Sequence, residues 1–244
     1  MRFFTDDYPA YNERANIERT IEQSIAALRP RFDRFEIVVV LDGPTDGTDA
    51  LAVKLAHEHE EITLLRNPHN MGVGPTLKRG LEAARYGLVV HNGMDYPFAL
   101  TDLDRMLPEL ARADVVVAAR TGYAGYTAWR RIVSALNRGL LRLFFDVPAS
   151  DCNFTQLYRR DVLHRVRVGS TAAGFIMPET IIRARDLGFR VIEVPIEYHA
   201  RQTGRSVLGR PKVLWHSLSD MLRFWWRRSV SPGDLHVAPH RERH

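Results

Sequence analysis

Residues 36–48, EIVVVLDGPTDGT, hold a continuous apolar run followed by a turn of acidic and glycine residues. An apolar run of this length, bounded by turn residues, predicts a buried strand, and a helix is expected over residues 48–58. Asp42 stands at the strand end, where a carboxylate can accept hydrogen bonds from a nucleobase or a ribose. Asp46 or Thr48 could serve only to cap the helix. The stretch therefore predicts one strand–turn–helix unit with a candidate binding residue at its turn.

The same alternation continues along the chain. Further strands are expected at residues 62–66, 88–91, 114–119, 153–158 and 190–197. Further helices are expected at residues 13–28, 101–111, 127–145, 174–187 and 211–228, and a glycine-rich segment leads into another within residues 70–86. This order predicts an α/β fold with a largely parallel sheet and helices on its faces. Ligands of such sheets gather beyond the carboxyl ends of the strands, so the acid- and glycine-rich turns are the candidate site.

Composition narrows the class of protein. The chain has 244 residues and a mass of 27.9 kDa, enough for one sizeable α/β domain. Its 45% hydrophobic and 26% charged residues argue against a disordered chain. The single cysteine, Cys152, excludes a disulfide scaffold and a zinc finger. A net charge of +5 fits nucleic acid, an anionic membrane surface or phosphorylated substrates equally well, so charge alone selects no partner.

No apolar stretch approaches the roughly 18 uninterrupted residues that cross a bilayer. Residues 1–13 carry acids where a signal peptide has its apolar segment, so we expect a soluble, cytoplasmic protein. Residues 1–210 are expected to form the main domain, residues 211–228 an amphipathic helix and residues 229–244 a flexible tail.

Three motifs resemble one known family. They are Pro-Ala-Tyr-Asn-Glu at residues 9–13, the Asp-Gly-x-x-Asp-Gly-Thr turn at residues 42–48, and Asn70-x-Gly72-x-Gly74 followed by Gly80. Within the first motif, Asn12 could be only a helix N-cap. Together the motifs resemble the family 2 glycosyltransferases, in particular the polyprenyl-phosphate, dolichol-phosphate mannosyltransferase-like group. The resemblance implies the GT-A fold, a nucleotide-sugar-binding α/β sandwich around a mixed sheet.

Two acidic motifs of that family are incomplete in this chain. Asp42 matches the second Asp of an Asp-Asp-Gly-Ser element, in which Leu41 replaces the first Asp. Asp95 matches the second Asp of the Asp-x-Asp motif that holds Mg²⁺ or Mn²⁺ against the donor's pyrophosphate, and Gly93 replaces the first. One carboxylate can still ligate Mg²⁺ together with phosphates and waters. Asp6 and Asp7 also depart from the pattern of an apolar first strand; they are either strand-end ligands or a sign of an altered N-terminal element.

Later segments resemble the acceptor side of the same family. Residues 151–154, Asp-Cys-Asn-Phe, match an element near the acceptor, although Asp151 could instead cap its own loop. Cys152 is expected to be a small buried residue and not a nucleophile. The family counterpart of Glu179 faces the site, and a solvated helix face is the alternative.

Residues 193–206 resemble the Glu-Val-Pro-Ile and Arg-x-x-Gly-x-Ser elements of the polyprenyl-phosphate transferases. Arg201 and Arg205 can grip phosphate oxygens, and Ser206 can donate a further hydrogen bond. A solvated basic loop is the alternative. Residues 224–228, Phe-Trp-Trp-Arg-Arg, and the segment 129–145 suit a membrane interface, unless the last helix packs on its own domain.

The resemblance implies an inverting transferase that moves a sugar from a nucleoside-diphosphate sugar to a polyprenyl phosphate, with Mg²⁺ or Mn²⁺, a peripheral contact with anionic membrane on the cytoplasmic face and no nucleic acid. Two alternatives stay open: a soluble acceptor with Asp151 or Glu179 as base, and a non-catalytic nucleotide-sugar binder. The expected catalytic residues are Asp95, which also holds the metal, Asp151 and Arg201. The expected donor-binding residues are Pro9, Tyr11, Glu13, Asp42, Gly72, Gly74, Arg205 and Ser206.

Overall fold

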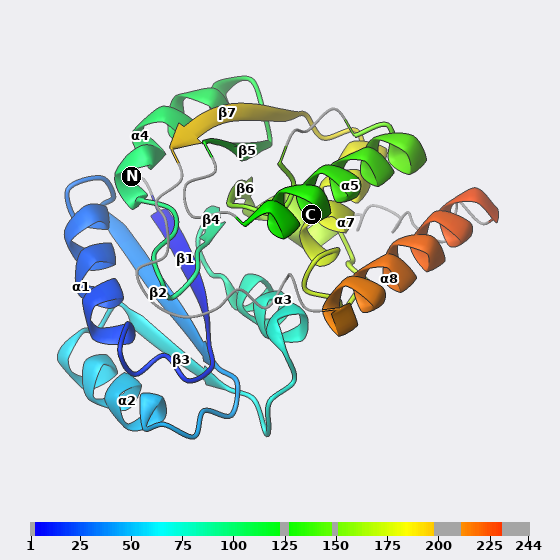
Figure 1. Ribbon diagram of the computed structural model, residues 1–244. Coiled ribbons are helices and arrows are strands. Elements are labelled where there is room, and N and C mark those ends of the chain that lie inside the picture. Colours follow the sequence, from blue (N-terminus) through cyan, green and yellow to red (C-terminus); the bar gives the residue numbers. More distant parts are fainter. Residues whose placement is uncertain (1–2, 123–126, 148–150, 198–210, 231–244) are drawn as a thin grey trace, which may run out of the picture.

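A computed structural model describes residues 3–122, 127–147, 151–197 and 211–230 (Figure 1). Its centre is a seven-stranded sheet in the order β3-β2-β1-β4-β6-β5-β7. The strands are β1 (Phe3–Ala10), β2 (Arg34–Leu41), β3 (Ile62–Arg66), β4 (Leu88–His91), β5 (Val115–Thr121), β6 (Gln156–Arg159) and β7 (Val191–Glu197). All neighbours are parallel except β6, which runs antiparallel to both β4 and β5. The largely parallel sheet predicted from the sequence is confirmed.

Helices cover both faces of the sheet. They are α1 (Ile17–Leu28), α2 (Thr48–Glu58), α3 (Val73–Ala83), α4 (Leu103–Met106), α5 (Ala128–Phe145), α6 (Arg160–Arg165), α7 (Ile176–Asp186) and α8 (Pro211–Val230), with 3-10 turns at Leu100–Asp102 and Leu107–Ala111. The buried side chains form two clusters, one with α1, α2 and α4 and one with α3 and α5–α8. Because strand side chains alternate between faces, the sheet separates the two clusters.

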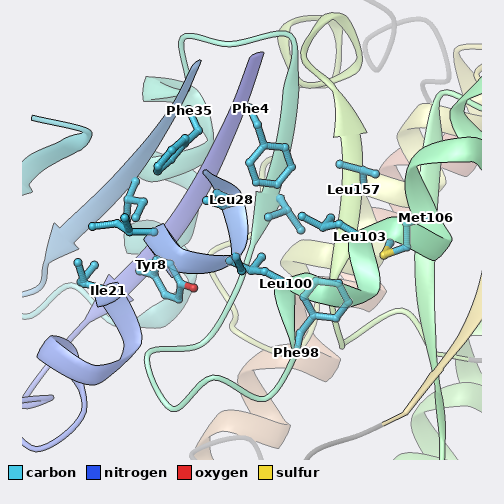
Figure 2. Packing of buried hydrophobic residues seen from close by; sticks show 14 of the residues in the cluster. Phe4, Tyr8, Ile21, Leu28, Phe35, Phe98, Leu100, Leu103, Met106 and Leu157 are labelled. Atoms are coloured by element: carbon cyan, nitrogen blue, oxygen red, sulfur yellow. The ribbon is translucent and has the colours of Figure 1, made fainter. Parts of the chain in front are cut away.

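The first cluster shows how the sequence pattern builds the core. Phe4 and Tyr8 of β1 point to the same face, and both are fully buried. Along α1, residues 17, 21, 25 and 28 are apolar at helical spacing, so this stripe packs on that face. Figure 2 shows Phe4 and Tyr8 beside Ile21 and Leu28. Phe98 and Leu103 belong to the same cluster and lie on the other side of β1 from Ile21.

Some element boundaries differ from those expected. The first helix begins at Ile17 and not at residue 13, because residues 13–16 form a turn in which the Glu13 carbonyl accepts from Asn16 N. The helix expected at 101–111 is broken into α4 and two 3-10 turns; Pro108 has no N–H to continue an α-helical ladder. The short helix α6 was not predicted. Ser229 and Val230, expected in a flexible tail, still belong to α8.

Asp6 and Asp7 occupy the middle of the regular eight-residue strand β1, which is paired on both sides. The residues are therefore not strand-end ligands, and the strand that holds them is regular. Both side chains are fully buried. Asp7 lies against Gly80 of α3, where an added Cβ would overlap its carboxyl group. The first strand is thus regular and buried, as in the family pattern, but it contains two acidic residues.

Within the described ranges, the length and apolarity needed to cross a membrane are found in none of the helices.

Candidate functional site

The candidate site lies at one edge of the sheet, where three neighbouring parallel strands end. Ala10 of β1 pairs with Leu41 of β2, and Asp7 pairs with His91 of β4. The segments that follow these strands therefore emerge side by side. They contain three of the eight residues that the sequence predicted as donor ligands, Tyr11, Glu13 and Asp42, together with Asp95.

The turn after β2 is tied to the segment after β1. The Asp46 carboxylate accepts from Thr48 N at 3.0 Å and from Arg14 N at 3.2 Å. Thr48 Oγ1 accepts from Glu13 N at 2.8 Å. The N-cap position of α2 is Gly47 and carries no side-chain cap, but Asp46, one residue earlier, satisfies the first N–H of the helix and also joins the two loops. Glu13 is consequently fixed at the edge of the sheet.

Asn12 does not cap the first helix. It adopts a left-handed backbone conformation with φ 54°, and its Oδ1 accepts from Thr45 N at 2.7 Å. The residue at the helix N-cap is Asn16, whose Nδ2 donates to Glu13 Oε2 at 2.7 Å. Asn12 thus holds the Asp42–Thr48 turn, and the adjoining Tyr11 is 45% exposed at the same edge.

Asp42 organises the loop that follows β3. Its Oδ1 accepts from Asn67 Nδ2 at 2.7 Å and Met71 N at 2.8 Å, and its Oδ2 accepts from Gly72 N at 2.9 Å. A carboxylate has about four acceptor positions, so about one is left for a ligand. Because Asp42 is buried, its main observed role is to hold Gly72 and the start of α3 against the end of β2.

The segment after β4 holds Asp95 beside Gly93. A Cβ added at Gly93 would lie 2.5 Å from Asp95 Oδ1. The Asp95 carboxylate therefore occupies the space that the first Asp of an Asp-x-Asp motif would enter. The intervening residue, Met94, is buried, and its carbonyl accepts from Thr20 Oγ1 at 2.7 Å. The turn is thereby anchored to α1.

His91, the last residue of β4, connects this strand to the segment that precedes β6. It was not predicted as a site residue. Its Nε2 lies 2.9 Å from the carbonyl oxygen of Phe154, and its Nδ1 has no hydrogen bond within the described part of the chain. Burial lowers the pKa of His91 to about 4, so the imidazole is neutral at neutral pH and Nε2–H donates to Phe154. A histidine at the end of an apolar strand was the available signal.

Asp151 is ion-paired, and its Oδ1 also accepts from Asn153 N at 3.4 Å, in line with the alternative that it caps its own loop. Arg120, at the end of β5, binds both of its oxygens, through Nε to Oδ2 and through Nη2 to Oδ1 at 2.8 Å. The Asp151 backbone N–H donates to Glu193 Oε1 at 3.2 Å. The Arg120 guanidinium also lies 5.2 Å from the centroid of the Phe154 ring. Sequence reasoning missed Arg120, which is far from Asp151 along the chain.

Glu179 neither faces an open site nor lies on a solvated helix face, so both expectations for it are wrong. It is 1% exposed. Its carboxylate accepts from Gly169 N, Ser170 N and Arg183 Nε at 3.0, 2.8 and 2.6 Å. Cys152 is buried as expected, and burial raises the pKa of its thiol to about 12, which makes it a poor nucleophile.

The remaining site predictions cannot be placed. Arg201, Arg205 and Ser206 lie outside the described residues. Within the described ranges, no three His, Cys, Asp or Glu side chains come together in a group that could hold a metal ion.

The strand order and the loops at this edge define a GT-A fold. Two crystal structures of glucosyl-3-phosphoglycerate synthase from Mycobacterium tuberculosis share it, one with Mn²⁺, UDP and glucosyl-3-phosphoglycerate and one with phosphoglyceric acid. Their TM-scores are 0.68 and 0.70, at 20% identity over 91% of this chain and 79% of theirs. The chain belongs to glycosyl transferase family 2, whose family model matches residues 8–167.

Similar proteins include two kinds of transferase. Glycosyltransferase AglD of Haloferax volcanii is 28% identical over 92% of this chain and 37% of its own length. The dolichyl-phosphate beta-glucosyltransferases ALG5A and ALG5D of Trichomonas vaginalis are 26% and 27% identical, over 78% of this chain and 64% of theirs. The chain therefore spans less than two thirds of each of these relatives.

Proposed function

We propose that this chain transfers a sugar from a nucleoside-diphosphate sugar to a polyprenyl phosphate, with inversion at the anomeric carbon. An acceptor phosphate oxygen attacks that carbon, and the nucleoside diphosphate leaves with the electrons of the broken carbon–oxygen bond. Family membership and the dolichyl-phosphate relatives support the reaction class. The observation that carries the choice of acceptor is the pairing of two buried carboxylates with arginine.

A hydroxyl acceptor needs a general base, and Asp151 and Glu179 were the candidates for that role. Asp151 is held by Arg120, while Glu179 is held by Arg183 and two backbone N–H groups. A carboxylate whose oxygens already accept hydrogen bonds from an arginine has fewer free lone pairs with which to contact an acceptor hydroxyl. A phosphate acceptor is anionic at neutral pH, so it needs placement and charge neutralisation instead of a base. In this proposal Asp151 positions the acceptor together with Arg120, and Arg201 contacts the phosphates.

The donor would bind across the loops at the sheet edge. Asp42 keeps about one acceptor position for the nucleoside. Asp95 suits a single carboxylate ligand of Mg²⁺ or Mn²⁺, because Gly93 leaves room for its carboxylate. Such a cation would neutralise charge on the departing diphosphate. The remaining donor contacts in this proposal are Pro9, Tyr11, Glu13, Gly72, Gly74, Arg205 and Ser206.

The surface of α5 and α8 suits a polyprenyl acceptor held in a bilayer. The two helices lie side by side in Figure 1, and the Phe144 and Trp225 rings are 5.4 Å apart. Exposed apolar side chains gather on both helices: Trp129, Ile132, Leu136 and Leu143 on α5, and Trp215, Leu222, Trp226 and Val230 on α8. Arginines follow them along both helices. Exposed aromatic and aliphatic side chains beside cations are typical of a peripheral contact with anionic lipid.

The transfer is tested with purified protein, Mn²⁺ and labelled UDP-glucose or GDP-mannose, with polyprenyl phosphate or a soluble hydroxyl acceptor. We expect label in the lipid phase, and a roughly hundredfold loss of kcat in Asp95→Asn, the size expected for loss of a charge-stabilising group. Label transferred to the hydroxyl acceptor without lipid would contradict the acceptor assignment. Nucleotide binding without turnover of any donor would favour the non-catalytic binder.

The membrane contact is tested by vesicle sedimentation. The Trp215→Ser/Trp226→Ser variant should lose most of its binding to phosphatidylglycerol vesicles while unfolding at the same temperature as the unaltered protein, because both side chains are more than half exposed. Phosphatidylcholine vesicles are the control for the contribution of lipid charge. Unchanged binding to anionic vesicles would exclude this face as the contact.

A further inference from the structure

Four consecutive backbone N–H groups in residues 169–172 are bound by two carboxylates from different helices. Glu179 of α7 accepts from Gly169 N and Ser170 N. Asp220 of α8 accepts from Thr171 N and Ala172 N, both at 3.0 Å and both through Oδ2. We call residues 169–172 the clamped loop. Each half of the loop is therefore held by one carboxylate.

The clamped loop packs on the start of α3. Gly74, in the first turn of α3, has no side chain, and an added Cβ would overlap the Thr171 carbonyl. One turn later, Lys78 Nζ donates to the Val168 carbonyl at 2.8 Å. Asp42 holds Met71 N and Gly72 N from the other side. The start of α3 is thus held between the end of β2 and the clamped loop.

Helix α8 is firmly attached to the domain on its inner face. Met221 and Phe224 are buried, and Phe224 packs against Phe145 and Phe175. At the far end of the helix, Arg228 binds both oxygens of Asp186 at 2.7 and 2.8 Å. Several separate contacts thus hold α8 on the domain, so the loss of the Arg228 contact alone leaves Asp220 in place.

We infer that Asp220 is a positioning residue of the donor site, which makes α8 part of that site and not an appendage to it. It acts through the clamped loop, by fixing the carbonyl of Thr171 against Gly74. Glu179 fixes the first half of the same loop. The inference rests on the proposed function, because it takes residues 72–74 as donor contacts. Its consequence is that loosening α8 at Asp220 weakens donor binding, whereas loosening α8 elsewhere does not.

The test uses three variants of the full chain and two probes, UDP and GDP, each with Mn²⁺ in calorimetry. Asp220→Ala removes both hydrogen bonds and should weaken binding of whichever nucleotide the unaltered protein binds by roughly tenfold, a usual size for coupling between sites. Asp220→Asn should bind within about threefold of the unaltered protein, because one amide oxygen can replace Oδ2. Asp186→Ala is the matched control, since it frees α8 at Arg228 without touching the clamped loop.

A second readout is hydrogen exchange of the amides of residues 71–76. Asp220→Ala should speed their exchange, while Asp220→Asn and Asp186→Ala should not. Equal losses of nucleotide affinity in Asp220→Ala and Asp186→Ala, or unchanged affinity in Asp220→Ala, would overturn the inference and leave the proposed function intact. Failure of the unaltered protein to bind either nucleotide would overturn the proposed function and the inference together.

Discussion

Two groups of buried carboxylates behave differently in this protein. Asp42, directly after β2, and Glu179, in α7, are 3% and 1% exposed, and each accepts three hydrogen bonds from nearby donors. We call them the loop carboxylates, because each binds two backbone N–H groups of a loop. In the central strand, Asp6 and Asp7 are fully buried, and their four oxygens have no hydrogen bond of normal geometry among the described residues. The backbone donors of a central strand are already used by its two neighbours, so none is left for a side chain.

Asp6 and Asp7 show what burial does to carboxyl groups that lack such partners. Burial raises the pKa of Asp6 well above its ordinary value, and Tyr8 offsets a small part of this. Burial again, and then the charge of Asp6, raise the pKa of Asp7. Protonation removes the cost of a buried charge. The loop carboxylates instead hold backbone N–H groups in place.

The largest effect is expected from breaking a loop carboxylate. Glu179→Ala leaves Arg183 buried without its counter-ion and two backbone N–H groups unsatisfied. The free energy of unfolding in urea should fall by about 3–5 kcal/mol. Glu58→Ala, which removes a surface partner of Lys54, is the control and should change it by less than about 0.5 kcal/mol. A loss in Glu179→Ala no larger than the control's would mean that the clamped loop needs no carboxylate.

His91 extends the comparison because it pairs in register with Asp7, while its pKa is shifted in the opposite direction, downward instead of upward. Its pKa falls from 6.5 to about 4 on folding, so its contribution is present above pH 6.5 and is lost as the pH falls toward 4. The full loss is about 3 kcal/mol, at about 1.4 kcal/mol per pKa unit. Unfolding in urea at pH 7 and pH 4.5 should show a smaller difference in His91→Gln. The same difference in both proteins would mean that His91 does not titrate on unfolding.

Replacing a strand carboxyl should have the opposite sign to replacing a loop carboxylate. Asp6→Val keeps the size of the side chain and removes polar atoms that lack good partners. It should raise the free energy of unfolding at pH 7 by about 1–3 kcal/mol. Asp6→Asn keeps a buried polar group and serves as the control, with no comparable gain. A fall in the free energy of unfolding in Asp6→Val would show that the Asp6 carboxyl makes a stabilising hydrogen bond in the folded protein.

The last effect is a dependence of stability on pH, which is the smallest of the effects when it is expressed per pH unit for one carboxyl. Because the folded pKa values of Asp6 and Asp7 are raised, their contribution is fully present below the unfolded pKa of about 4 and is lost as the pH rises toward the folded pKa. Each carboxyl contributes at most about 1.4 kcal/mol per pH unit. The difference in unfolding free energy between Asp6→Val/Asp7→Val and the unaltered protein should therefore grow from pH 5 to pH 8. A constant difference would contradict the raised pKa values.

Local patterns predicted the parts of the fold that depend on local chemistry. The boundaries of α2, β3 and β4 coincide with those expected, because short apolar or amphipathic runs end there in turn residues. The order of these units was enough to predict a largely parallel sheet. The position of Asp42 at the end of β2 was predicted for the same reason.

The rest depended on contacts between distant residues. Nothing near Asp151 in the sequence indicates that Arg120 pairs with it, and nothing near Asp220 indicates the loop that it holds. Asp6 and Asp7 were predicted to be strand-end ligands or to mark an altered element, because a sequence pattern does not show that a regular strand can contain buried acids. The sequence pattern therefore predicted where the candidate site lies on the sheet, but it did not predict the role of each carboxylate there.

The contact between Asp7 and Gly80 also constrains how this protein could change. The carboxyl of Asp7 fills the space that any side chain at position 80 would need. A larger residue on the helix could be accepted only after the strand residue has become smaller, so the order of the two substitutions matters. Substitutions at position 7 of the central strand β1 are in this way coupled to substitutions at position 80 in α3.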